Sequence, residues 1–285
     1  MIISHIIGGM GNQFFQYAAG RALSIRHSTP LKLDIHDFAE YELRRFELGN
    51  FPTQFSLATE EDTRLLKPAT NLAKALQYLR SKKNRTYHRE RHFHYDPGFK
   101  KIGAETYLKG NFQSQKYFQD IRPVLLQELA VPENKIGKVS DLGKQIKNEN
   151  SVSVHIRRTD YTKPVFLEYH GLCTAAYYRE AIDHLRKADP DCRFYFFSDD
   201  IDWAQNEIPV ENATYVSGNI ANTHYEDFYL MQCCRHNIIA NSSFSWWAAW
   251  LNSFPGKTVI APRKWFGPSG PADTQDIIPE TWITF

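Results

Sequence analysis

The feature of the sequence that most constrains its fold is a regular alternation of short apolar segments with longer helical ones across residues 151–261. In Ser151–Ile156 the apolar residues fall at every second position, which indicates a buried strand. Strands are also expected at Arg193–Phe197, Ala213–Val216, Asn237–Ala240 and Lys257–Ala261, with helices at Ala175–Ala188, Asp202–Asn206, Tyr225–Cys234 and Phe244–Asn252. Short strands that alternate with helices predict a parallel sheet with helices on both faces.

The first half of the chain gives a weaker α/β pattern. We expect strands at Ile2–Ile7, Pro30–Ile35 and Thr106–Gly110, a turn at Gly8–Asn12, and helices at Gln13–His27, Glu60–Leu66, Asn71–Leu79 and Tyr117–Leu129. The polar stretch 132–150 is a plausible domain boundary, and 285 residues suit two domains of modest size. The prediction is therefore an α/β protein with domains at 1–140 and 150–265 and a C-terminal tail at 266–285.

Composition narrows the classes of partner. The net charge of +2 gives no reason to expect a nucleic-acid partner. The four cysteines show no C-x-x-C spacing and are expected to be free thiols. No segment has the roughly 18–20 apolar residues of a membrane span, and the N-terminal apolar run is too short for a signal peptide. We therefore expect a cytoplasmic protein; its oligomeric state is left open.

One segment departs from this near-neutral charge. Basic and aromatic residues crowd residues 80–94: Arg80, Lys82, Lys83, Arg85, Arg89 and Arg91 are interleaved with Tyr87, His88, His92 and His94. Such a run is typical of a solvated helix face or loop. It is also typical of a peripheral contact with an anionic membrane surface, here the inner face. Both interpretations stay open.

Polar residues follow four of the predicted strands of the second half. They are His155–Arg158, Ser198–Asp200, Ser217–Asn219 and Asn241–Ser243. Because the carboxyl ends of parallel strands share one edge of a sheet, we expect these residues to face a common crevice. The guanidinium groups of Arg157 and Arg158 match phosphate oxygens in pairs, which predicts a diphosphate site. The alternative is that both arginines make surface salt bridges.

The other polar groups of this crevice also have two interpretations each. Asn241, Ser242 and Ser243 either cap the next helix or bind phosphate at its N-terminus. Asp199 and Asp200 resemble a cation-binding pair, but two neighbouring arginines reduce the need for a metal ion, and no metal is predicted. Asp227 either complements a helix dipole or accepts hydrogen bonds from the edge of guanine.

The turn Gly8–Gln13 resembles the glycine-rich turn of dinucleotide-binding enzymes. The pattern fails because its third glycine position, counted from Gly9 and Gly11, is occupied by Phe14. We expect instead that Gly9 lets a substrate approach the backbone and that Asn12 donates an amide hydrogen bond.

Three motifs occur in an order that resembles the bacterial α-1,2-fucosyltransferases of glycosyltransferase family 11. They are Gly8–Tyr17 (GGMGNQFFQY), His155–Tyr161 (HIRRTDY) and Asn241–Trp247 (NSSFSWW), and the resemblance runs from residue 2 to about residue 262. It implies a GT-B-like fold with two Rossmann-like domains that face a central cleft. It also implies inverting transfer of L-fucose from GDP-β-L-fucose to a galactose 2-hydroxyl, without metal or cofactor, in surface polysaccharide or O-antigen synthesis.

The resemblance assigns roles to residues of this sequence. The N-terminal domain would face the galactose-containing acceptor, and the second domain would bind GDP-fucose. Arg157 would hold the β-phosphate, His155 would contact the nucleotide, Asp227 would read guanine, and Ser242 and Ser243 would bind phosphate. Arg158 would brace the loop, and Asp199 with Asp200 matches a looser motif near the nucleotide. The general base is open among Asp160, Glu168 and His170, with Asp160 ranked first.

Other functions remain to be distinguished. One is a fucosyltransferase of another linkage, α-1,6 or O-fucosyl, that shares the arginine motif. A second is a nucleotide-dependent oxidoreductase built on the Gly9 turn, and a third is a sugar-binding module without catalysis. Acceptor specificity is expected in residues 36–115, where the sequence pattern is least regular.

Overall fold

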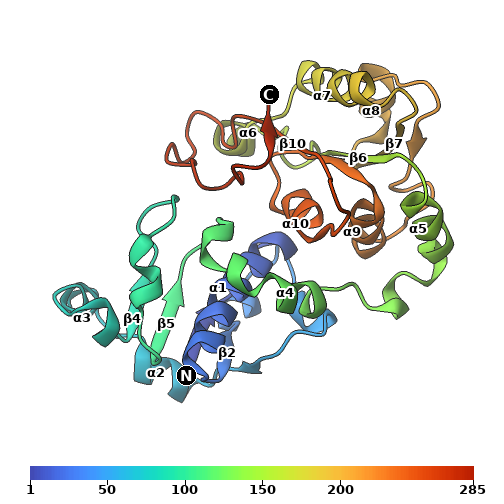
Figure 1. The fold of residues 1–285 in the computed structure, drawn as a ribbon. Coiled ribbons are helices and arrows are strands. Elements are labelled where there is room, and N and C mark those ends of the chain that lie inside the picture. The colour runs from blue at the N-terminus through green and yellow to red at the C-terminus, as the bar shows by residue number, and fades with distance from the viewer. The chain divides into compact units, whose positions relative to one another are not determined.

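The computed structural model describes residues 1–285 and divides them into two compact α/β units (Figure 1). Unit 1 comprises Met1–Ala130 and Asp273–Pro279, and unit 2 comprises Val131–Ala272 and Glu280–Phe285. Residues 266–285, expected to form a separate tail, are instead shared between the two units. None of the helices combines the length and apolar character that crossing a membrane requires.

Unit 1 contains a five-stranded sheet in the order β3-β2-β1-β5-β4, with every pair parallel. Its elements are β1 (Ile2–His5), α1 (Met10–His27), β2 (Leu31–Asp34), β3 (Ser56–Leu57), α2 (Glu60–Leu66), α3 (Asn71–Gln77), β4 (Tyr87–Arg89), β5 (Thr106–Lys109) and α4 (Arg122–Glu128).

The sheet of unit 1 has a helix on each face. Ile3 of β1 packs with Leu66 of α2 on one face. The next residue, Ser4, points to the opposite face, where its hydroxyl donates to the carbonyl of Gln16 in α1. Gly20 of α1 lies so close to β1 that a Cβ there would be 3.0 Å from the Cβ of Ser4. This close approach of α1 to β1 explains why position 20 is a glycine.

Several details of unit 1 differ from the sequence-based prediction, including the two-residue strand β3, which was not expected. Helix α1 begins at Met10, so Asn12 lies in its first turn, and only Gly8, with a φ of +89°, needs a left-handed backbone. The helix expected at 117–129 begins with 3-10 turns, and α4 starts only at Arg122, where a proline fits its first turn. Strand β4 was not expected, because it lies in the basic segment.

Unit 2 contains a six-stranded parallel sheet in the order β11-β10-β9-β6-β7-β8, which confirms the predicted parallel sheet. Its elements are α5 (Ser140–Lys147), β6 (Ser151–Ile156), α6 (Pro164–His170), α7 (Ala175–Ala188), β7 (Arg193–Ser198), α8 (Ile201–Glu207), β8 (Thr214–Tyr215), α9 (His224–Cys233), β9 (His236–Ile238), α10 (Ser243–Leu251), β10 (Val259–Ala261) and β11 (Ile283–Thr284).

The sheet of unit 2 is covered on both faces. Helices α7 and α8 lie on one side of it and α9 and α10 on the other (Figure 1). Strand β6 is buried along its whole length. Its apolar residues, including Val154, join the core beneath α7, whereas His155 points toward α10. Because all strands are parallel, the residues that follow β6, β7, β8 and β9 emerge at one edge.

Candidate functional site

Two arginines at the carboxyl end of β6 pair with carboxylates from their own loop and from the residues that follow the neighbouring strand β7. The register pairs Ile156 with Ser198, so Asp199 follows β7 beside Arg157. The Nη1 atom of Arg157 lies 2.9 Å from Oδ2 of Asp199, and its Nη2 atom lies 2.5 Å from Oδ2 of Asp160. The Nε atom of Arg158 lies 3.1 Å from Asp200, and its guanidinium carbon lies 4.0 Å from the ring centre of Trp203.

These ion pairs form a network that orients Arg157 at the sheet edge. Asp199 also accepts a hydrogen bond from the backbone N–H of Arg158 at 2.8 Å. The Arg157 side chain is 27% exposed. Burial opposes its charge, but Asp199 and then Asp160 outweigh this effect and raise the pKa of Arg157. A guanidinium has five N–H donors, so two carboxylates leave it able to bind an anion as well.

His155 is a buried, neutral group next to this network. Its ring lies 5.6 Å from that of Phe244 in α10, measured between ring centres. Burial lowers the pKa of His155 to about 4, so the imidazole carries no charge near neutral pH. The Nδ1 atom is buried and has no hydrogen-bond partner. A buried nitrogen without a partner is costly, which makes it a candidate contact for a ligand.

Asp227, in the first turn of α9, is connected to the same edge through Ser217. Its Oδ2 atom accepts a hydrogen bond from the Ser217 hydroxyl at 2.7 Å, and that hydroxyl accepts one from the backbone N–H of Ser198 at 3.1 Å. The Oδ1 atom of Asp227 is buried and has no partner. Burial raises the pKa of Asp227 to about 7. Ser217 was not among the predicted site residues, although the polar run after its strand indicated it.

The structure gives Asn241 a role different from the predicted one. Its amide Nδ2 donates to the carbonyl of His170 at 2.7 Å and to that of Trp265 at 3.2 Å, and its Oδ1 accepts from the thiol of Cys173. Asn241 therefore braces two chain segments, and its amide is not presented to a phosphate. Ser242 precedes α10, but its side chain makes no capping hydrogen bond, and Ser243 is the half-buried first residue of the helix.

Comparisons with known proteins identify the family of this chain. Residues 56–285 match the sequence profile described as Glycosyl transferase family 11. An Escherichia coli α-1,2-colitosyltransferase is 35% identical over 99% of this chain and 98% of its own length. The E. coli O-antigen biosynthesis glycosyltransferase WbnK is 33% identical over 92% of this chain and 94% of its own. The chain belongs to glycosyltransferase family 11.

The fold of this family 11 glycosyltransferase is also found in solved structures. The α-1,6-fucosyltransferase NodZ from Bradyrhizobium, soaked with GDP-fucose, superposes with a TM-score of 0.52 at 12% identity, over 88% of this chain and 91% of that chain. At this level of identity the likeness concerns the fold, which is the expected GT-B-like α/β class with parallel sheets.

The three candidate bases of the glycosyltransferase lie in the loop and helix that follow Arg158. Asp160 accepts a hydrogen bond from Arg157, as described above. Glu168 is exposed on α6. His170, the last residue of α6, stacks on Tyr161 with the ring centres 4.5 Å apart. Burial lowers the pKa of His170, which favours the neutral imidazole.

Gly9 and Asn12 lie in unit 1, whereas the residues discussed above lie in unit 2. Gly9 precedes α1 with an ordinary negative φ. Asn12 accepts a hydrogen bond from the amide of Gln113 at 2.9 Å through its Oδ1 atom. Phe14, at the third glycine position of the dinucleotide pattern, is fully buried in the core.

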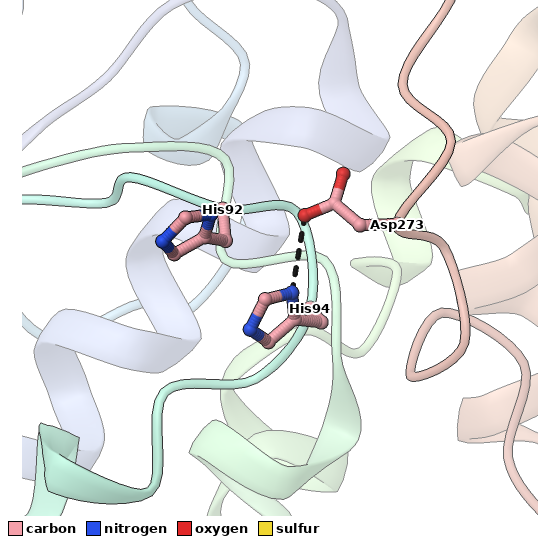
Figure 2. Close-up of side chains that lie close together, drawn as sticks. All are labelled: His92, His94 and Asp273. Atoms are coloured by element: carbon pink, nitrogen blue, oxygen red, sulfur yellow. Dashed lines mark hydrogen bonds and ion pairs between the residues drawn. The ribbon is translucent and has the colours of Figure 1, made fainter.

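The residues best arranged to hold a metal ion lie in unit 1, whereas Asp199 and Asp200, whose spacing resembles a cation-binding pair, belong to unit 2. Asp199 and Asp200 bond to arginines, which leaves them poorly suited to bind a cation. His92, His94 and Asp273 each offer a ligand atom, all within 4.8 Å of one another. Figure 2 shows His94 turned toward Asp273, with Nδ1 3.1 Å from its carboxylate, while the His92 ring stacks on that of His94.

Proposed function

We propose that this glycosyltransferase transfers L-fucose from GDP-β-L-fucose to the 2-hydroxyl of a galactose-containing glycan and inverts the anomeric configuration. Residues 150–265 would bind the donor, and residues 1–140 would recognise the acceptor. The observation that carries the proposal is the oriented guanidinium of Arg157, at the same sheet edge as His155 and Asp227. The relative WbnK supports a role in O-antigen synthesis. Four free cysteines are consistent with a cytoplasmic location.

The proposal gives Arg157 the central catalytic role. In an inverting transfer, the bond from the sugar to the diphosphate breaks through an oxocarbenium-like state, and the leaving diphosphate gains negative charge. A cation that is already oriented stabilises that charge more strongly than it stabilises the bound donor. Ser242 and Ser243 at the start of α10 would add hydrogen-bond donors to the phosphates. Arg158, paired with Asp200 and packed on Trp203, would keep the loop in place.

Asp227 and His155 would bind the nucleoside. The N1–H and N2–H groups of guanine are donors on one edge of the base, and a carboxylate accepts from both. The Oδ1 atom of Asp227 has no partner within the protein, so guanine would satisfy a buried acceptor. His155 would likewise hydrogen-bond the nucleotide through Nδ1. Asp199 would act through Arg157, by orienting its guanidinium.

Two assignments of the general base remain in the proposal. Asp160 follows the clamp directly, but a carboxylate that already accepts from a guanidinium is a weaker base. His170 is half-buried, and its lowered pKa favours the neutral imidazole. A histidine base must be neutral in this way to accept a proton near pH 7. We retain Asp160 as the first candidate, with His170 as its alternative, because their variants give different pH profiles.

The colitosyltransferase relative favours a second candidate function. Colitose is L-fucose without its 3-hydroxyl, so a family 11 enzyme could use either sugar with the same nucleotide site. The deciding experiment supplies GDP-fucose and GDP-colitose separately, with a panel of galactose-terminated glycans, and assigns the product linkage by NMR.

An α-1,2-fucosylated product would support the proposal. An α-1,2-colitosylated product alone would replace it with the second candidate. A different linkage, or binding of NAD(H) without GDP release, would contradict the proposed reaction, and glycan binding without GDP release would indicate a sugar-binding module. The Arg157→Ala variant is the control, because its turnover should fall by about 10²–10³ with either donor.

A further inference from the structure

Helix α3 and the turn that follows it expose an apolar face in unit 1. Leu72, Leu76 and Leu79 are 72%, 51% and 83% exposed. Their spacing of four and three residues places them on one side of a helix. The backbone N–H of Leu79 bonds to the carbonyl of Leu76 at 3.2 Å, so the turn continues past the end of α3. Single exposed leucines are common, but three on one face form a patch that water does not favour.

A cationic cavity lies against the same helix. Its volume is about 350 Å³. Its lining includes Tyr78, Lys82, Arg85, Arg89, Glu90 and Arg91. Lys82 pairs with Asp96, whereas the three arginines make no ion pair with a carboxylate. Glu90 accepts from the backbone N–H groups of Asn111 and Phe112, and burial raises its pKa to about 7. The cavity is therefore positively charged.

Tyr78 joins the apolar face to the cavity. The guanidinium carbon of Arg91 lies 3.6 Å from the centre of the Tyr78 ring, and that of Arg85 lies 4.9 Å from it. The Tyr78 hydroxyl donates to the carbonyl of Arg89 at 3.4 Å. Tyr78 directly follows α3, and Arg89 ends the edge strand β4, which lies beside α3 (Figure 1). The leucines and arginines therefore belong to one ordered surface.

We propose that this surface docks on an anionic lipid bilayer, with the leucines in the headgroup region and the arginines on lipid phosphates. A bilayer surface offers negative charge and an apolar layer within a few ångströms, which is the pairing that this surface complements. Nucleic acid offers the charge without the apolar layer. The proposal goes beyond the transferase reaction and does not depend on which sugar is transferred.

The test is co-sedimentation of the full chain with vesicles of phosphatidylcholine alone or mixed with phosphatidylglycerol, at low and high salt. We expect binding only to the anionic vesicles and weaker binding at high salt. Each basic residue near an anionic surface contributes about fivefold in partitioning (about 1 kcal/mol), so Arg89→Gln with Arg91→Gln should weaken binding by roughly 25-fold. Leu76→Gln with Leu79→Gln should also weaken it, at unchanged net charge.

Matched controls separate this surface from general effects of charge and apolar exposure. Arg263→Gln with Lys264→Gln removes two exposed basic residues of unit 2, and Leu43→Gln with Val165→Gln removes two exposed apolar side chains elsewhere. Both controls should bind vesicles as the unmodified protein does. All variants change exposed residues, and thermal unfolding would verify that they are folded.

Four results would overturn the proposal. The first is equal binding to neutral and anionic vesicles, and the second is equal loss in the variants and their controls. The third is arginine-dependent binding of inorganic pyrophosphate without vesicle binding, which would assign the cavity to a soluble phosphate. A chelator should leave vesicle binding unchanged. The fourth result is a loss of vesicle binding when the chelator is added, which would assign the contact to a metal ion at His92, His94 and Asp273 (Figure 2).

Discussion

The loop after β6 and the segment around β4 are both rich in arginine, but their arginines are held differently. Arg157 and Arg158 each pair with carboxylates and are mostly buried. Arg89 and Arg91 are exposed, and Arg91 packs on Tyr78 without a carboxylate. Carboxylates fix the position of the first pair at the end of a buried strand. The positive charge of the second pair lies at the surface and is not balanced by a paired carboxylate.

This difference shows that the surroundings of an arginine, and not the number of arginines, indicate its role. A site that stabilises charge on one atom of a substrate needs a cation oriented before the reaction. Attraction to a charged surface needs only net charge within reach of it, and such attraction is screened by salt. Substitutions in either region should therefore have different effects on transfer and on membrane binding.

The largest effect is expected for Arg157→Ala. Removing an oriented donor to a developing negative charge costs about 10²–10³ in turnover, or about 3–4 kcal/mol of transition-state stabilisation. Steady-state transfer assays with GDP-fucose would measure kcat and KM. Near-normal kcat in this variant would mean that Arg157 has only a structural role, through its ion pairs with Asp160 and Asp199.

The next effect is expected for Asp227→Asn. Hydrogen bonds to a charged group contribute about 1.5–3 kcal/mol, so GDP affinity should fall by between about tenfold and a hundredfold. Calorimetry would measure it. UDP is the matched ligand, because it has the same diphosphate without guanine. If the variant lost affinity for both nucleotides equally, Asp227 would not read the base.

The pKa of Asp227 predicts a pH dependence of the same affinity. Its pKa of about 7 means that the carboxylate is protonated below and ionised above neutral pH. Guanine supplies donors, so it favours the ionised form, and GDP affinity should rise from pH 6 to pH 8. The phosphate of GDP also titrates in this range, but Asp227→Asn retains that contribution. The difference between the two proteins isolates Asp227.

Folding stability should change with pH in the opposite direction. Because the pKa of Asp227 is higher in the folded protein than in the unfolded chain, the folded state binds more protons between about pH 4 and pH 7. The protonated Asp227 carboxyl therefore contributes stability at low pH, and this contribution is lost as the pH rises through 7. Urea unfolding at pH 5 and pH 8 would measure this loss as a decrease in the free energy of unfolding. The decrease should be smaller in Asp227→Asn than in the unmodified protein.

A smaller effect is expected for Asp160→Asn if Asp160 positions Arg157. Asparagine still accepts a hydrogen bond, so kcat should fall by about tenfold or less, with the pH profile unchanged. If Asp160 is the base, kcat should fall by about 10²–10⁴ and the acidic limb of the profile should disappear. His170→Gln completes the comparison, because only one of the two variants should lose that limb.

Asn241→Ala should act on stability more than on the donor. It removes the hydrogen bonds to His170 and Trp265 and leaves their carbonyls without this partner, at a cost of about 1–3 kcal/mol. Urea unfolding would measure this loss. Ser243→Ala is the control at the half-buried start of α10, where little loss is expected. Equal stability of the two variants would contradict the bracing role.

The smallest effect is expected for Arg89→Gln with Arg91→Gln on transfer to a soluble acceptor. The two side chains are exposed and make no ion pair with a carboxylate, so turnover should change by less than about twofold. A large loss of turnover would place the cavity in the catalytic machinery and remove the contrast between the two arginine pairs.

The sequence predicts the regular parts of unit 2 well, because their patterns are strong. β6 and α7 have the expected bounds, since every second residue of the strand is apolar and the helix begins after a threonine cap. β4 was missed because basic residues hide two buried ones, Tyr87 and His88. β11 was missed because two residues form a strand only by pairing with β10, a contact distant in sequence.

The site could be predicted in part for the same reason. Strand periodicity placed Arg157, Asp199 and Ser217 at one sheet edge, where the structure has them. It could not show that Asp199 bonds to Arg157, because that contact depends on the register between β6 and β7. Nor could it show that Asn241 braces Trp265, since a polar residue before a helix is usually a cap.

The most direct test of the central claim is calorimetric titration of GDP into the unmodified protein and Arg157→Ala, with a chelator present. The claim is that the oriented arginine at the end of β6 binds the diphosphate of the donor. It predicts one GDP per chain for the unmodified protein and a loss of at least about tenfold in affinity for the variant. Equal affinity in the two proteins would contradict it.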